Sequence, residues 1–429
     1  MDCTVVLKAC SIKFHSRLCS NSFLSFSLMS VCMLFSVLVL ESNLISTARA
    51  GGWSRTNDPR LMEIETGLGS FEYKFSGLPN SGRLSVRPWT DTYWPTCRGG
   101  IGCRWQGEVS ERTGFLNVEN KYFTKEEVMH MNKEDLMNLA PCEKFDVARC
   151  DYPSSLVGAG TGIFEGMGGG VLRRKGWTLT QFEDKRVGGL LHGLAERWTG
   201  LCHGWSAAAL FFEEPGCINY RNRDGVEVPF VCSDIKGLLT FMQGECRRAG
   251  NEFFVGERSS ATFDNSDFNA EGRNETNDIN AGAFHVIMAN RIGKLDKGFV
   301  LDVTTDEQVW NQPLEAFESS VIAEGVATPE VSAKGAVREV EILSDVTYTV
   351  EAGASAQPQN EADGEPEASF RRHKQYRYIL ELDKDDQNIG GRWITTYYPD
   401  FVWSFPKVNF PGIFMELKNI YEQSLKNKQ

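Results

Sequence analysis

One cysteine and the glycines beside it constrain this chain more than any other feature. Cys202 stands in the run Trp198-Thr-Gly-Leu-Cys-His-Gly-Trp-Ser-Ala-Ala-Ala-Leu, where a glycine-broken loop leads into a helix-forming apolar stretch. A cysteine in the first turn of a helix faces unpaired backbone N–H groups and the positive end of the helix dipole. Both favour the thiolate, which is the nucleophilic form. Cys202 is therefore a candidate nucleophile, and a half-cystine of an exported protein is the alternative.

A histidine and a carboxylate follow in two apolar segments downstream. His285 lies in residues 283–290 and Asp302 lies in residues 298–304; both segments are short, apolar and rich in branched side chains. With glycine and charge between them, they predict two strands of a hairpin. Cysteine, histidine and carboxylate in this order fit an acyl-transfer triad of Cys202, His285 and Asp302. A histidine that is simply satisfied in the core is the alternative for His285.

Four other side chains are candidates for the surroundings of the thiol. Trp198 and Trp205 flank Cys202 and are placed to exclude water. The backbone N–H of Cys202 and an indole N–H, such as that of Trp198, are candidate oxyanion donors. Trp310 and Asn311 are candidates for the oxyanion or acceptor site, and Asn311 is also an alternative to Asp302 as the orienting group.

Several segments resemble a known family. Gly200-Leu-Cys-His-Gly-Trp-Ser-Ala-Ala-Ala-Leu is similar to the nucleophile segment of the oomycete transglutaminase elicitors and their bacterial relatives. Gly282-Ala-Phe-His-Val, Gly298-Phe-Val-Leu-Asp-Val-Thr-Thr and Val309-Trp-Asn-Gln-Pro are similar too, in the same order along the chain. The resemblance spans about residues 85 to 406. The glycine-rich insert at 158–170 and the acidic stretch at 351–369 have no counterpart.

The resemblance implies a fold and a reaction. It implies an α+β, papain-like or transglutaminase-type fold in which the nucleophile helix packs on an antiparallel sheet. It places nucleophile, base and orienting acid at Cys202, His285 and Asp302. The implied enzyme is a protein-glutamine γ-glutamyltransferase, which forms a thioester with a glutamine side chain and passes the acyl group to a lysine or polyamine. Its partners would be glutamine-bearing proteins and amine donors.

Two other functions stay open at the level of sequence. A secreted cysteine protease or amidase uses the same triad with water as the acceptor. A disulfide-stapled surface recognition protein has no catalytic thiol at all. No cofactor is needed for the covalent chemistry and no metal-binding motif is present; calcium dependence is possible, but no EF-hand loop supports it.

The first 50 residues indicate export. Lys8, Lys13 and Arg17 precede an uncharged apolar stretch at 23–40, and Ala48-Arg-Ala50 supplies the small residues of a cleavage site. We expect a cleaved signal peptide and an extracellular protein; an uncleaved anchor of a type II membrane protein is the alternative. The formal net charge of −12 excludes an electrostatic footprint for nucleic acid.

The remaining chain divides by composition. We expect a lead-in or pro-segment at 51–84, a catalytic domain at 85–410 and an amphipathic helix at 411–429. Within the domain, 158–170 and 351–369 are predicted to be flexible loops, and further strands are predicted around 337–350 and 375–383. Eight of the 12 cysteines lie beyond residue 50, and with Cys202 reserved they predict three disulfides and one spare thiol.

Overall fold

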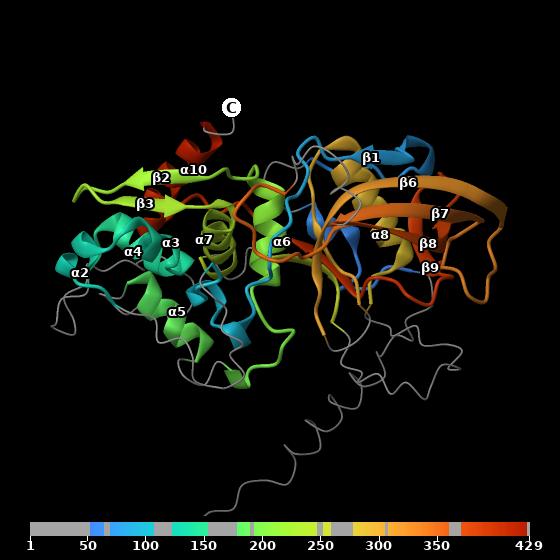
Figure 1. Cartoon of the computed structure of the whole chain (residues 1–429). Coiled ribbons are helices and arrows are strands. Elements are labelled where there is room, and N and C mark those ends of the chain that lie inside the picture. The colour runs from blue at the N-terminus through green and yellow to red at the C-terminus, as the bar shows by residue number, and fades with distance from the viewer. Residues whose placement is uncertain are drawn as a thin grey trace, which may run out of the picture. The chain divides into compact units, whose positions relative to one another are not determined.

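Helix α6 (Cys202–Phe211) stands between a mainly helical part and a large sheet in a computed structural model of the chain (Figure 1). Each part has its own hydrophobic core, and a small third cluster contains Ala207, Phe401 and Trp403. The structure describes residues 52–63, 69–106, 122–152, 178–188, 193–246, 252–258, 278–304, 308–359 and 370–426. The first core is formed mainly by helices. The second core lies between a large sheet and helix α8 (Ala281–Met288).

Helices make up most of the first core and strands most of the second. The other α-helices of the described residues are α2 (Lys125–His130), α3 (Lys133–Met137), α4 (Pro141–Arg149), α5 (Leu179–Val187), α7 (Cys232–Glu245) and α10 (Met415–Lys426). Short 3-10 helices are η1 (Pro59–Met62), η2 (Phe75–Gly77), η3 (Thr96–Arg98), η4 (Gly100–Gly102) and η7 (Gly412–Phe414), and η6 (Ala289–Lys294) is π-helical.

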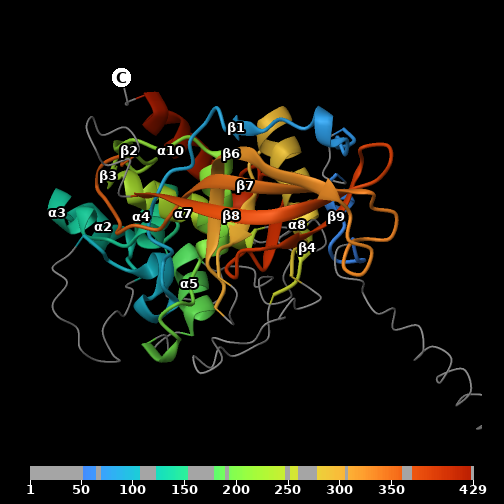
Figure 2. The same cartoon turned by 90° about the vertical axis from the view of Figure 1, so that its right-hand side faces the viewer.

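The large sheet is antiparallel at each of its strand pairs. Its order is β4-β10-β5-β6-β7-β8-β9, with β1 also paired to β6. These strands are β1 (Ser81–Arg83), β4 (Phe253–Gly256), β5 (Val300–Asp302), β6 (Asn311–Val326), β7 (Arg338–Thr349), β8 (Arg371–Leu382), β9 (Asn388–Trp393) and β10 (Phe401–Ser404). A separate hairpin pairs β2 (Ile218–Arg221) with β3 (Glu227–Phe230). Figure 2 shows β6, β7 and β8 side by side.

Small residues let α6 approach both of its neighbours. The helix packs on α7 and on β6. A Cβ built on Gly204 would lie 2.3 Å from the carbonyl oxygen of Thr240, so only glycine permits this approach to α7. The alanines at 207–209 are buried as well. An apolar helix on an antiparallel sheet is the expected α+β architecture.

The strand predicted at 283–290 is wrong, because these residues form α8 and the start of η6. The Asn280 side chain caps the helix by accepting hydrogen bonds from the N–H groups of Gly282 and Ala283. Every residue of α8 is buried, and the helix packs on β8 and β9. A helix buried on all sides shows the same continuous apolar run as a buried strand, which explains the error.

Part of the predicted acidic flexible loop has a defined structure. Residues 351–359 run past the start of α7, where the N–H of Ser233 donates to the carbonyl of Ser355 at 3.0 Å. The N–H of Ala352 donates to the carbonyl of Asp91, also at 3.0 Å. These residues therefore form defined backbone hydrogen bonds with two distant segments. Residues 360–369, the glycine-rich insert at 158–170 and the N-terminal 50 residues lie outside the described residues.

The eight cysteines of the described residues are all thiols, so the three predicted disulfides are not formed in this structure. None of the described helices is long and apolar enough to cross a membrane. After the turn η7, the C-terminal segment forms α10, which buries Leu417 and Ile420 in the first core.

Candidate active site around Cys202

Cys202 is the first residue of α6 and is almost fully buried, with 7% of its surface exposed. The residue before it, Leu201, is anchored because its N–H donates to the carbonyl oxygen of Tyr93 at 2.7 Å. The loop before the helix also needs a glycine, since a Cβ on Gly200 would lie 2.6 Å from that same oxygen. The glycine-broken loop therefore places the thiol at the helix N-terminus.

The side chain of Asn311 faces the sulfur. Asn311 begins β6, and its Nδ2 lies 3.4 Å from the Cys202 Sγ. Its Oδ1 accepts a hydrogen bond from the indole Nε1 of Trp403 at 2.7 Å. An indole N–H can only donate, so it requires the amide oxygen on its own side and leaves the amide N–H₂ toward the sulfur. Asn311 is thereby set as a hydrogen-bond donor to Cys202.

Burial works against the thiolate form of Cys202 that the helix N-terminus favours. Burial raises the pKa of the Cys202 thiol above its usual range, and hydrogen bonds from the side chain and backbone of Asn311 and the backbone of His203 lower it only in part. The Sγ also lies 3.8 Å from the carbonyl oxygen of Val309. Loss of solvation on burial is the largest cause of the raised pKa. Polar groups of a bound substrate would solvate the sulfur in place of water and so favour the thiolate.

Asp302 lies beside this site but serves a neighbouring loop. It is fully buried at the end of β5, directly opposite Asn311 in the β5–β6 register. Its Oδ1 accepts a hydrogen bond from the backbone N–H of Trp310 at 2.9 Å. The same oxygen accepts from the backbone N–H and the hydroxyl Oγ1 of Thr304 at 3.3 and 2.9 Å. These bonds join the two ends of the segment that links β5 to β6.

His285 does not join Cys202 in this structure. Its Nδ1 lies 2.8 Å from the hydroxyl of Tyr378, which lies 2.6 Å from the Oγ of Ser344. Ser344 is in turn 2.6 Å from the Oγ of Ser319 in β6. Ser319 is eight residues from Asn311 along the same strand, or roughly 26 Å at the rise of an extended strand. Burial lowers the pKa of His285 to about 4, so the imidazole is neutral.

The three tryptophans predicted for the site take different positions. Trp310 lies at the site, with its ring edge-on to Tyr93 at a centroid distance of 5.8 Å. Trp205 is fully buried in the first core, one helical turn from Cys202. Trp198 is partly exposed, and the guanidinium of Arg258 lies 5.9 Å from its ring centroid.

Sequence analysis missed Trp403 as a site residue. Its strand, β10, pairs with β5 and so comes beside Asn311 only through the order of the sheet. The run Phe401–Ser404 is buried throughout, which gives no alternation to mark one side chain as special. A donor-only indole in a buried strand is a signal that a hydrogen-bond acceptor lies nearby.

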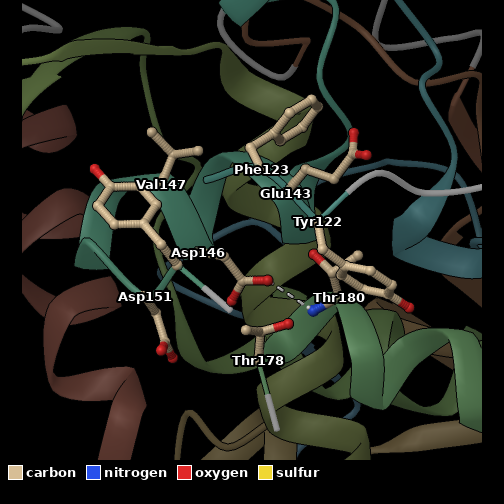
Figure 3. Close-up of a pocket in the computed structure, with 9 residues that line it drawn as sticks. Tyr122, Phe123, Glu143, Asp146, Val147, Asp151, Thr178 and Thr180 are labelled. Atoms are coloured by element: carbon tan, nitrogen blue, oxygen red, sulfur yellow. Dashed lines mark hydrogen bonds between the residues drawn. The ribbon is translucent and has the colours of Figure 1, made fainter. Parts of the chain in front are cut away.

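A pocket lies in the helical part, away from Cys202. Its lining includes Glu143, Asp146, Asp151 and two tyrosines, Tyr122 and Tyr152. Figure 3 shows Asp146 hydrogen-bonded to Thr180; its two oxygens accept from the N–H groups of Leu179 and Thr180 at 2.8 and 2.9 Å. Asp146 therefore caps the start of α5 and joins it to α4. Among the described residues no group of three His, Cys, Asp or Glu side chains is placed to hold a metal ion.

An α+β fold that sets a thiol at a helix N-terminus against a side-chain amide donor suits proteins that transfer acyl groups through a cysteine. The chain matches the Transglutaminase elicitor family over residues 185–411 and belongs to that family. Its structure is similar to the crystal structure of the GP42 transglutaminase from Phytophthora sojae, with a TM-score of 0.53 and 21% identity over 87% of this chain and 99% of that chain. This likeness shows a shared fold. Comparison with curated protein sequences gave no match.

Proposed function

We propose that this protein is a protein-glutamine γ-glutamyltransferase with Cys202 as its nucleophile. The observation that carries the proposal is the Asn311 amide, which Trp403 turns toward the sulfur 3.4 Å away in a member of the transglutaminase elicitor family. A fixed donor beside a nucleophile stabilises negative charge at the sulfur and at an adjoining carbonyl oxygen.

The first half of the proposed reaction forms a thioester. The Cys202 sulfur attacks the γ-carboxamide carbon of a substrate glutamine, the C–S bond forms and the C–N bond breaks. The thiol proton leaves with the nitrogen as ammonia. Asn311 Nδ2 would donate to the developing negative charge, together with the backbone N–H groups at the start of α6. A papain-like nucleophile arrangement is part of this proposal.

The second half transfers the acyl group to an amine. A lysine side chain or polyamine attacks the thioester carbon, the C–N bond forms, the C–S bond breaks, and the departing sulfur takes a proton from the amine nitrogen. The Nδ1 of His285 is bonded to the Tyr378 hydroxyl in this structure, so the base predicted at His285 stays a prediction and this proposal assigns no step to that imidazole. Asp302 would support the site by accepting a hydrogen bond from the backbone N–H of Trp310.

Secretion and independence from a cofactor complete the proposal. The basic start, the apolar stretch and Ala48-Arg-Ala50 support cleavage after Ala50. N-terminal sequencing of the mature protein is expected to begin at Gly51, and an intact Met1 on membrane-extracted protein would contradict it. Activity that survives a calcium chelator would support the cofactor-free chemistry.

An assay of three products tests the reaction. The full-length protein would be given a glutamine-bearing protein and a fluorescent diamine, and amine incorporation, ammonia release and peptide cleavage would be measured together. We expect incorporation with ammonia release, and both abolished by Cys202→Ala. Cys103→Ala, at a half-buried thiol elsewhere, is the matched control. Peptide cleavage without incorporation would instead indicate a protease, and full activity in Cys202→Ala would overturn the proposal.

A further inference from the structure

Glu351 lies where the chain leaves β7, beside the start of β6. The two strands pair up to Leu314 and Tyr348, so the residues after Thr349 run alongside Asn311 and Gln312. The backbone is fixed on both sides of Glu351. The N–H of Val350 donates to the carbonyl of Phe370, and the N–H of Ala352 donates to that of Asp91, both at 3.0 Å.

Only one of the two carboxylate oxygens of Glu351 has a hydrogen-bond partner. Its Oε2 accepts a hydrogen bond from Gln312 Nε2 at 2.8 Å. Its Oε1 is buried and has no hydrogen-bond partner, and Glu351 forms no ion pair within the described part of the chain. An unpaired buried carboxylate oxygen is costly, because burial removes the water that would otherwise solvate it. Such a group calls for a functional explanation.

The carboxylate of Glu351 lies near the thiol and two tyrosines. Its charge acts on the Cys202 thiol and on the hydroxyls of Tyr93 and Tyr348. Tyr93 is the residue whose ring contacts Trp310 and whose carbonyl anchors the start of α6. A carboxylate with an unpartnered oxygen matches the chemistry of a primary ammonium group, which carries the opposite charge and donates hydrogen bonds.

The charge of Glu351 opposes the first half of the proposed reaction. A neighbouring carboxylate raises the pKa of the Cys202 thiol, which disfavours the thiolate needed for attack on glutamine. The second half of the reaction, in contrast, needs a proton acceptor. The later step is attack by an amine, which is protonated at neutral pH and must lose a proton to become a nucleophile.

We propose that Glu351 binds the ammonium group of the amine donor through its unpartnered oxygen and accepts the proton that activates the amine. This inference rests on the proposed γ-glutamyl transfer. One proton passes from the ammonium nitrogen to Glu351. The neutral amine then attacks the thioester carbon, the C–N bond forms, the C–S bond breaks, and the second proton on nitrogen goes to the departing sulfur. Glu351 afterwards releases its proton to solvent. Burial also raises the pKa of this carboxyl, which makes it a better proton acceptor.

The test separates the two half-reactions of the intact protein. Ammonia release without amine measures thioester formation and hydrolysis, and incorporation of a diamine measures transfer. Hydroxylamine serves as a second acceptor, since it is largely uncharged at neutral pH and needs no base to become nucleophilic. Glu351→Gln keeps the shape and the bond to Gln312. Glu330→Gln, which removes an exposed carboxylate from the β6–β7 turn, is the matched control.

We expect Glu351→Gln to lower diamine incorporation about 100-fold, the usual contribution of a general base, while Glu330→Gln leaves it unchanged. Ammonia release and hydroxamate formation should stay within about threefold of the unmodified protein. Glu351→Asp, which keeps the charge, should retain more diamine incorporation than Glu351→Gln, and a thermal melt confirms that each variant is folded.

Equal losses with the diamine and with hydroxylamine would overturn the inference, because a structural defect affects both acceptors. Unchanged diamine incorporation in Glu351→Gln would overturn it as well. A different result would contradict the proposed function itself. In that case the unmodified protein would release no ammonia from glutamine, and Glu351 would have no amine donor to activate.

Discussion

The indole Nε1 of Trp403 donates to the Oδ1 of Asn311 at 2.7 Å, and this bond decides which end of the amide meets the thiol. Without it, the amide of Asn311 is free to turn its oxygen toward the sulfur. An oxygen there would repel a thiolate, whereas the N–H₂ group stabilises it. Trp403 therefore acts on the sulfur through Asn311 as a positioning residue.

Trp403→Phe is expected to raise the pKa of the Cys202 thiol and to slow ammonia release about tenfold. The reason is loss of the donor that holds the amide, with an aromatic ring kept at the stack on Phe405. The rate of alkylation by iodoacetamide as a function of pH measures the thiol directly, and its midpoint should move to higher pH. Trp393→Phe removes a different indole donor, which bonds the carbonyl of Ile279, and should leave that midpoint in place. An unmoved midpoint in Trp403→Phe would contradict the positioning role.

Asp302→Asn separates two roles for the carboxylate at the end of β5. An orienting acid of a triad loses several orders of magnitude on this change, because the base takes the wrong tautomer. In this structure the Oδ1 of Asp302 accepts from Trp310 and Thr304, and asparagine keeps an oxygen there. We therefore expect Asp302→Asn to retain ammonia release within about tenfold, and Asp302→Ala to lose about 100-fold as the loop loosens. Steady-state rates of ammonia release by the two variants distinguish the two roles. A loss of several orders of magnitude in Asp302→Asn would support Asp302 as the orienting acid of a catalytic triad.

The position of Cys202 at the start of a helix could be predicted from sequence because every cue is local. Gly200 stands in the loop just before the helix, and the alanines at 207–209 favour helix. The strand predicted for His285 failed because α8 is buried on all sides and so shows no helical periodicity. The capping side chain of Asn280 was the local cue that favoured a helix.

The partners of Cys202 could not be predicted from local patterns. Asn311 meets the sulfur because α6 packs on β6, and Trp403 meets Asn311 because β10 lies beside β5 in the sheet. Glu351 was assigned to a flexible loop because its segment is rich in small and polar residues. Its backbone is nevertheless held by bonds to distant segments, including that of Asp91, and composition does not record such bonds.

Gly204→Ala is expected to destabilise the fold by about 1–3 kcal/mol and to slow thioester formation. The added Cβ would lie 2.3 Å from the carbonyl oxygen of Thr240, so α6 must move away from α7 and carry Cys202 with it. Urea denaturation gives the change in the free energy of unfolding. Gly325→Ala, in an open part of β6, is the control and should change it by less than about 0.5 kcal/mol. Equal stability of the two variants would show that the helix contact is not tight.

His285→Gln is expected to change the pH dependence of stability while leaving the chemistry in place. Burial lowers the pKa of His285 from 6.5 to about 4. Between these values the unfolded chain binds a proton that the folded protein does not. The stability contribution of the neutral imidazole is therefore present above pH 6.5 and is lost as the pH falls toward 4, by about 3 kcal/mol in total. The free energy of unfolding of the unmodified protein minus that of His285→Gln should fall over this window, as measured by urea denaturation at several pH values. Ammonia release should stay within about threefold, because the imidazole is bonded to Tyr378, in a hydrogen-bond chain that reaches β6 at Ser319 and not at Asn311. Loss of ammonia release in a folded His285→Gln would return the histidine to the catalytic triad predicted from sequence.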